Sequence, residues 1–322
     1  MTTDQEYREE LRVAGGTTMG VLWAAPAGGP GAADGAEGLR LRAEELLAEH
    51  GAVMIHGLGI ADAEEFHAAV DRFGDRLIRS YRGGNTPRVA VSDGVFTSTE
   101  YPARFEISLH NELSYAHSWP RRLFFGCLLA AETGGATPVC DGAALLAALD
   151  PELRARFAAG VTYRQYLHGG YGLGKSWQAT FETEDRVEVE GFLRESEAEF
   201  AWTPEGGLRV IQHRQGILEH PVTGRPVWFN QADQWHPSNL PEGEAGTLLS
   251  LIDSTDDLPH WVTYRDGSPI PDEDLAKVRE AARRHRLSVP WQDGSLLVVD
   301  NLRVLHGREA YTGARRVLVS MT

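Results

Sequence analysis

The 322-residue chain contains only two cysteines, Cys127 and Cys140, and no uninterrupted apolar run that approaches about 18 residues. Both cysteines lie in apolar or turn-like contexts, so we expect buried reduced thiols rather than a disulfide. The N-terminal stretch MTTDQEYREELRV has neither an apolar core nor a positively charged leader. These absences exclude an ordinary transmembrane helix and a signal peptide, and they predict a soluble cytoplasmic protein.

Basic residues are also scarce, with 31 Lys and Arg against 46 Asp and Glu and a formal net charge of −15. Nucleic acids and anionic membranes require local positive charge, so this balance disfavours both as partners. A few arginines can nevertheless converge in a pocket. The hydrophobic content of 42% is enough to form a sizeable core, and the length allows one large domain or two ordinary ones.

Short apolar stretches spread to both ends of the chain predict a β-rich protein of the α+β class with flanking helices. Residues 1–36 are rich in Gly, Ala and Pro and predict an N-terminal lead-in segment. Residues 37–322 then form a single domain, with a helical and loop insertion at about 150–220, where aromatic and acidic residues mix. The predicted strands lie at 52–55, 88–91, 105–115, 122–130, 226–230, 294–300, 302–307 and 315–321, and the predicted helices at 39–50, 62–73, 141–149 and 272–286.

His110, Glu112 and His306 are candidate metal ligands. Side chains two apart on a strand share a face, so His110 and Glu112 point the same way if the strand stays extended. His306 lies at the end of a late apolar strand. Two histidines and one carboxylate leave three open positions on an octahedral ion, which is typical of non-heme Fe(II) sites. Zinc accepts the same three ligands with a water, so a zinc-dependent hydrolase remains an alternative.

Two adjacent arginines, Arg315 and Arg316, follow His306 and offer a charge partner for an acidic co-substrate. On a strand they face opposite sides, so only one can enter the pocket. Arg315 shares its face with Val317 and Val319, and Arg316 shares its face with Leu318 and Ser320. The alternation therefore does not choose between them.

Four stretches carry a resemblance to a known family, namely HNELSY at 110–115, GGATPVCD at 134–141, HPVTGRPVWFNQ at 220–231 and PWQDGSLLVVDNLRVLHGREAYTGARRVLVSM at 290–321. From about residue 40 to its end the chain resembles the taurine catabolism dioxygenase superfamily of Fe(II)/2-oxoglutarate enzymes. It is more similar to the branch that is syringomycin-biosynthesis-like and clavaminate synthase-like. The resemblance implies a double-stranded β-helix, or jelly roll, with a helical insertion between the early and late strands.

Carried onto this chain, the resemblance implies that His110, Glu112 and His306 bind Fe(II), with 2-oxoglutarate and O₂ as co-substrates. Arg316 would hold the distal carboxylate of 2-oxoglutarate through its two-point fork, and Thr137 would hydrogen-bond the same carboxylate. Additional substrate contacts are expected from residues that share the face of His110 or lie in the 220–236 region, namely Glu106, Ser108, Asn230, Gln231 and His236.

The resemblance also implies the reaction, in which 2-oxoglutarate is oxidised to succinate and CO₂ while a substrate C–H bond is hydroxylated. The expected substrate is a small molecule, often an amino acid hydroxylated at its β-carbon, free or tethered to a carrier protein, in the biosynthesis of antibiotics and other specialised metabolites. The same hydrogen abstraction can lead instead to desaturation or cyclisation. Glu112 disfavours a halogenase, whose relatives carry a small residue there. The intact triad disfavours a non-catalytic jelly-roll regulator.

Overall fold

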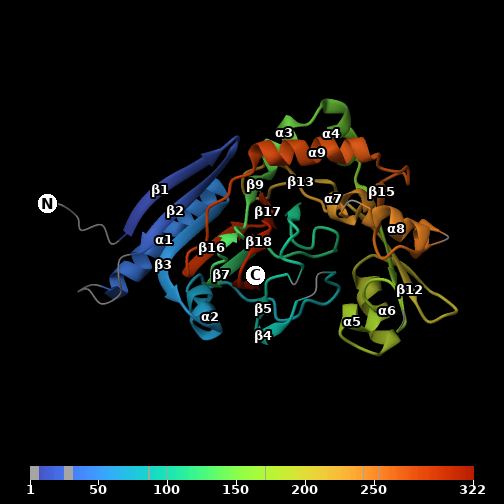
Figure 1. Ribbon diagram of the computed structural model, residues 1–322, viewed down its shortest axis with the longest axis horizontal. Coiled ribbons are helices and arrows are strands. Elements are labelled where there is room, and N and C mark those ends of the chain that lie inside the picture. The colour runs from blue at the N-terminus through green and yellow to red at the C-terminus, as the bar shows by residue number, and fades with distance from the viewer. Residues whose placement is uncertain are drawn as a thin grey trace.

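The computed structural model describes residues 7–24, 32–85, 88–99, 101–170, 172–241, 243–252 and 254–322. A mixed eight-stranded sheet forms one side of the molecule, in the order β1-β2-β3-β16-β7-β19-β5-β4 (Figure 1). The pair β2–β3 is parallel, and the other described pairs of this sheet are antiparallel. Its strands are β1 (Tyr7–Ala14), β2 (Thr17–Ala24), β3 (Ala52–Ile60), β4 (Ala90–Ser92), β5 (Val95–Thr97), β7 (Arg122–Leu129), β16 (Gly294–Asp300) and β19 (Arg316–Met321).

The central strands of this sheet are buried on both faces because apolar residues fill both of their alternating positions. The outer face is covered by α1 (Ala32–His50) and α2 (Ala63–Asp71), and the side chain of Asp62 caps α2 by accepting from two backbone nitrogens. Gly126 in β7 is required for this packing, since a Cβ there would clash with the ring of Phe66 on α2. The inner face carries a separate apolar cluster and positions the site.

A three-stranded sheet lies over the inner face, in the order β6-β17-β9, and contributes Val139 and Leu305 to the inner cluster. Its strands are β6 (Ile107–His110), β9 (Val139–Asp141) and β17 (Val304–Arg308). Strand β17 follows β16 after a three-residue turn, so the chain passes directly from the large sheet to the small one. The elements around this layer are β8 (Thr133–Gly134), β18 (Tyr311–Thr312), β13 (Ile217–Glu219), β14 (Pro226–Trp228), α3 (Gly142–Ala148), α4 (Pro151–Ala158), α7 (Ala232–Trp235), α8 (Glu244–Ser250), α9 (Asp272–His285) and the 3₁₀ helices Pro237–Asn239 and Thr255–Asp257.

The region expected as a helical and loop insertion is built on a four-stranded sheet, in the order β11-β12-β10-β15. Two short helices pack on it around a small apolar core that includes Trp177, Phe181 and Leu208. Strand β15 comes from beyond residue 220, so the unit is not continuous in sequence. Its elements are β10 (Val161–Leu167), β11 (Glu199–Trp202), β12 (Leu208–Arg214), β15 (Trp261–Tyr264), α5 (Trp177–Phe181) and α6 (Arg186–Glu195).

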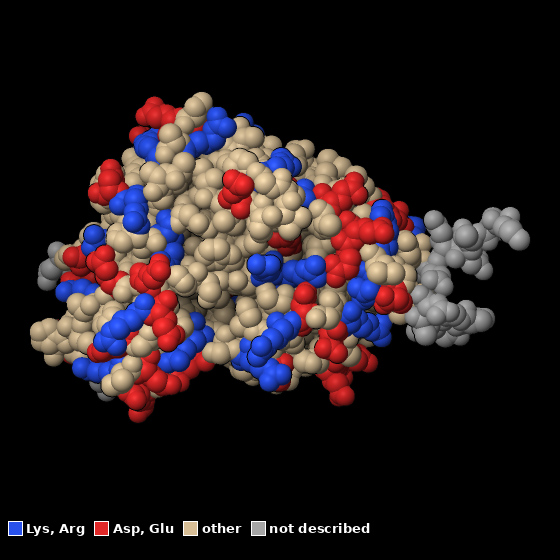
Figure 2. Space-filling model, turned by 180° about the vertical axis from the view of Figure 1, so that it is seen from behind, with Lys and Arg blue, Asp and Glu red and all other residues tan. Residues whose placement is uncertain are grey.

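The N-terminal segment also differs from expectation, because residues 7–24 form the hairpin β1–β2 and extend the large sheet. Strand β1, YREELRVA, is polar and half exposed at the sheet edge, so it lacks the apolar alternation that marks a strand. Both cysteines are buried and unpaired, as predicted. No helix among the described residues is long and apolar enough to cross a membrane. Acidic and basic side chains are interspersed on the face in Figure 2.

Candidate metal centre

His110, Glu112 and His306 converge between the two sheets. His110 ends β6 and pairs in register with His306 on β17. Glu112 Oε2 lies 3.9 Å from His110 Nε2 and 3.7 Å from His306 Nε2, and one ligand atom from each residue lies within 4.8 Å of the others. All three side chains are buried. The three predicted ligands can therefore contact a single ion.

Glu112 reaches the site by a turn and not by strand alternation, because β6 ends at His110. Asn301, after β16, holds this turn: its Oδ1 accepts from the Glu112 backbone nitrogen at 2.7 Å, and its Nδ2 donates to the Glu112 carbonyl at 3.1 Å. The Asn111 side chain donates to the Asn301 carbonyl at 2.7 Å. Leu113, the next residue, has a left-handed φ of 56°, which is uncommon for a non-glycine residue. The sequence analysis did not identify Asn301. The only feature that sets it apart in the sequence is its side-chain amide directly after an apolar strand.

The imidazoles are arranged to present neutral nitrogens. His110 Nδ1 donates to the Ser108 carbonyl at 2.8 Å, which leaves Nε2 facing Glu112. The side-chain amide nitrogen of Gln234 lies 2.9 Å from the same Nδ1 and donates to the same carbonyl at 3.2 Å. Burial lowers the pKa of His110, and it lowers the pKa of His306 well below the ordinary value. Both rings therefore keep a lone pair for a metal at neutral pH.

Two further residues hold the carboxylate of Glu112. The Tyr81 hydroxyl donates to Oε1, and Arg88 Nη2 donates to Oε2 at 2.7 Å. The side chains of Arg88 and Glu112 are each only 2% exposed, so this ion pair is screened from water. Tyr81 and Arg88 precede the triad in a segment with few regular elements, and no sequence pattern marked them.

A small cavity beside the triad contains Arg315 and Thr137. It is lined by both histidines, and the Thr137 hydroxyl also accepts from Trp291 Nε1 at 3.3 Å. Arg315 Nε donates to the Gly135 carbonyl at 2.9 Å. The pKa of Arg315 is lowered to about 10, mainly by burial and secondly by the positive charge of Arg308. Arg315 therefore remains protonated at neutral pH.

Arg316, the predicted residue of the arginine pair, is exposed and does not line this cavity. The reason lies in how β19 packs. Val317 and Val319 belong to the inner cluster on the side of the site, whereas Leu318 belongs to the outer cluster under α1 and α2. Arg315 shares the inner side, and Arg316 shares the outer side.

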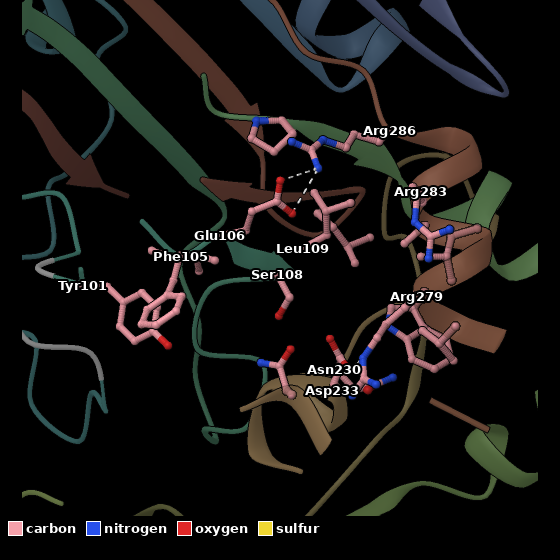
Figure 3. A pocket seen from close by; sticks show the side chains of 18 of the residues that line it. Tyr101, Phe105, Glu106, Ser108, Leu109, Asn230, Asp233, Arg279, Arg283 and Arg286 are labelled. Atoms are coloured by element: carbon pink, nitrogen blue, oxygen red, sulfur yellow. Dashed lines mark hydrogen bonds and ion pairs between the residues drawn. The ribbon is translucent and has the colours of Figure 1, made fainter. Parts of the chain in front are cut away.

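Three of the predicted substrate residues, Glu106, Ser108 and Asn230, line a second cavity of about 520 Å³ between β6 and α9 (Figure 3). Ser108 points into it from β6, and Glu106, just before β6, forms an ion pair with Arg286 at 3.3 Å, while Arg279 and Arg283 of α9 line the other side. The small sheet separates this cavity from the triad: Leu109, Pro138 and Leu305 line the larger cavity, while their neighbours in sequence, His110, Thr137 and His306, line the smaller one.

The other two predicted substrate residues, Gln231 and His236, line neither of these cavities. Gln231 Nε2 donates to Gln234 Oε1 at 2.9 Å, so it supports the residue that lies against His110. His236 Nδ1 lies 2.8 Å from Ser238 Oγ and its ring stacks with Trp261. These contacts indicate positioning and packing roles.

Comparison with known proteins shows which family has this site. The profile of the taurine catabolism dioxygenase TauD, TfdA family matches residues 23–322. The dapdiamide synthesis protein DdaC of Enterobacter agglomerans is 34% identical over 279 residues, which cover 86% of this chain and 84% of the relative. A clavaminate synthase-like protein of Arabidopsis thaliana is 29% identical over 288 residues, covering 86% of this chain and 83% of that protein.

Solved structures show the same fold. The PvcB protein of Pseudomonas aeruginosa aligns with a TM-score of 0.57 and 16% identity, covering 100% of this chain and 92% of PvcB. AAD-2 in complex with Mn(II) and N-oxalylglycine aligns with a TM-score of 0.54 and 15% identity, covering 98% of this chain and 97% of AAD-2.

The chain belongs to the taurine catabolism dioxygenase TauD, TfdA family. It is a non-heme dioxygenase that uses Fe(II) and 2-oxoglutarate, and the triad of His110, Glu112 and His306 has the donor set that such iron requires. The family membership removes the support for a zinc-dependent hydrolase and for a non-catalytic regulator.

Proposed function

We propose that this dioxygenase hydroxylates an unactivated C–H bond, often at the β-carbon, of a free or carrier-tethered amino acid in the biosynthesis of a specialised metabolite. The buried triad carries the oxygenase part of this proposal. The metabolic part is supported by 34% identity to a protein named for dapdiamide synthesis. No nucleic acid or membrane partner is proposed.

His110, Glu112 and His306 would hold the ion, and Tyr81 and Arg88 keep the carboxylate of Glu112 oriented. Iron bound there, with 2-oxoglutarate and O₂, would supply the oxidising chemistry that hydroxylates a substrate C–H bond while 2-oxoglutarate is converted to succinate and CO₂. The small sheet shields the imidazoles from solvent, which keeps the reacting centre dry.

We assign the distal carboxylate of 2-oxoglutarate to Arg315 and Thr137, in place of the Arg316 expected from sequence. Both line the cavity that contains His110 and His306. The guanidinium of Arg315 is held by Gly135 and by Ser98 Oγ, the latter at 3.4 Å. A fixed, charged fork in a buried cavity suits a carboxylate better than a flexible surface arginine does.

We also propose that the two sheets form the double-stranded β-helix of this family. The large sheet and the β6-β17-β9 sheet share the inner apolar cluster, and the triad lies where they meet. The chain crosses from one sheet to the other between β16 and β17, as this arrangement requires.

Desaturation or cyclisation is the alternative outcome for the same hydrogen abstraction. One relative, 21% identical over 83% of this chain, is named 3-((Z)-2-isocyanoethenyl)-1H-indole synthase, a name that describes an ethenyl product. The two outcomes share the first step and differ in the product.

The test is turnover of 2-oxoglutarate to succinate with Fe(II) and O₂ in the presence of free amino acids and, separately, aminoacyl groups on a carrier protein. Mass spectrometry of the products then separates the gain of one oxygen atom from the loss of two hydrogens. Stimulated succinate formation with an oxygenated amino acid supports the proposal. Stimulation only by substrates of another class contradicts it.

A further inference from the structure

Arg88 has more hydrogen-bond donors in the metal cavity than the described protein groups use. Its side chain is only 2% exposed and lines the cavity together with His110 and His306. Nη2 donates to Glu112, but Nε and Nη1 are buried with no hydrogen-bond partner among the described residues. Buried polar groups in folded proteins are nearly always satisfied, so these donors indicate a missing acceptor.

The charges around Arg88 indicate that this acceptor is an anion. In the loaded site the charges of a divalent ion and of doubly ionised 2-oxoglutarate cancel. Of the remaining groups, Arg88, Arg308 and Arg315 are positive and Glu112 is negative, which leaves two positive charges around the cavity. Uncompensated buried charge is costly, and an anionic ligand reduces that cost.

The position of Arg88 is fixed by its contacts with the rest of the molecule. Its guanidinium lies over the ring of Tyr81 with 5.0 Å to the centroid. The preceding residues are tied to the insertion, since Lys175 Nζ donates to the Gly84 carbonyl at 2.9 Å and Gln165 Nε2 donates to Asn85 Oδ1 at 2.7 Å. Arg88 therefore presents its free donors from a supported segment.

We propose that Arg88 binds a carboxylate of the primary substrate beside the metal, so that the substrate is a molecule with a free acid group. Nη2 has a second hydrogen that Glu112 does not use. Together with an unpartnered nitrogen, it can donate the two parallel hydrogen bonds that match a carboxylate. The inference deepens the proposed function, because an amino acid tethered through its carboxyl group to a carrier has no α-carboxylate to offer. The alternative carboxylate that Arg88 could bind is the one at the keto-acid end of 2-oxoglutarate.

The test compares the wild type with Arg88→Gln and Arg88→Lys, each loaded with Mn(II) so that binding is measured without turnover. Isothermal titration follows binding of 2-oxoglutarate, and then of L-amino acids, small carboxylic acids and the corresponding amides to the protein with 2-oxoglutarate bound. The matched control is Arg79→Gln, which removes a charge that is 75% exposed nearby in the chain. Melting curves and Mn(II) affinity verify that each variant is folded.

We expect acids that bind the wild type to bind Arg88→Gln roughly 30-fold or more weakly, whereas amides bind both proteins with similar, low affinity. Arg88→Lys keeps a charged donor for Glu112 but lacks the fork, so it should retain Mn(II) and lose about 5- to 10-fold in acid affinity. Arg79→Gln should bind acids as the wild type does. A role confined to positioning Glu112 would give Arg88→Lys the acid affinity of the wild type.

Three results would overturn the inference: equal acid affinity in Arg88→Gln and the wild type, no acid that binds the wild type better than its amide, or a loss confined to 2-oxoglutarate. The last result would assign Arg88 to the co-substrate. Failure of the proposed function is separate, because succinate formation by the wild-type protein would then be stimulated only by substrates other than amino acids.

Discussion

Asn301 and Glu112 are joined by two hydrogen bonds, one in each direction, although 189 positions separate them in sequence. Through these bonds the turn after β16 determines where the carboxylate ligand after β6 lies. Asn301 Nδ2 also donates to the Pro120 carbonyl at 2.8 Å, so its amide is fully used at a site with no solvent exposure. The metal centre thus depends on a residue that contacts neither the metal nor a substrate.

Replacement of this asparagine, Asn301→Ala, should weaken metal binding and folding together. It leaves buried backbone groups of Glu112 and Pro120 without partners, which we expect to lower the free energy of unfolding by roughly 2–4 kcal/mol. Urea denaturation measures the stability, and Mn(II) titration measures the affinity. Unchanged Mn(II) affinity in a folded Asn301→Ala protein would contradict the positioning role.

Arg315 and Arg316 allow a matched comparison that tests which arginine binds 2-oxoglutarate. Arg315→Ala should raise the KM for 2-oxoglutarate by roughly tenfold or more, because it removes a buried charged fork from the cavity. Arg316→Ala should leave that KM unchanged, because its side chain is exposed on the opposite side of β19. Steady-state succinate formation gives both values. The reverse pattern would reinstate Arg316 and refute the assignment of Arg315.

Stability should fall in mild acid because of partly buried histidines such as His260. The pKa of His260 is lowered from 6.5 to about 4, mainly by burial and secondly by the positive charge of Lys175. Below pH 6.5 this histidine is protonated in the unfolded chain but stays neutral in the folded chain. The free energy of unfolding therefore decreases as the pH falls from 6.5 toward 4. The loss from this residue is at most about 3 kcal/mol.

His260→Phe should therefore flatten the decrease in unfolding free energy between about pH 7 and pH 5, as measured by urea denaturation. His117→Phe is the control, because that side chain is 45% exposed. An unaltered slope in His260→Phe would show that other groups cause the acid sensitivity.

The central strands β3, β7 and β16 could be predicted from sequence because apolar residues fill both of their faces. The hairpin of residues 7–24 could not, since β1 is a polar edge strand that is identified only by its partner. The sheet of the insertion was also missed, because its aromatic residues are mixed with charged ones and its fourth strand comes from a distant part of the chain.

The metal ligands were predicted by residue type and order, although the reason given for Glu112 was incomplete. A two-residue spacing predicts a shared strand face, whereas the structure uses a turn held by Asn301. The choice between Arg315 and Arg316 required knowing which side of β19 faces the triad, and this depends on the packing of two sheets. Arg88 begins the strand predicted at 88–91 and lies two residues before β4, and that prediction did not indicate that its side chain enters the site.

The most direct measurement of the central claim is the visible spectrum of the anaerobic protein with Fe(II) and 2-oxoglutarate. A weak metal-to-ligand charge-transfer band should appear in the wild type and in His117→Ala, and it should be lost in His110→Ala and His306→Ala together with succinate formation after O₂ is added. A wild-type protein with no band, or a band that persists in both triad variants, would contradict the account.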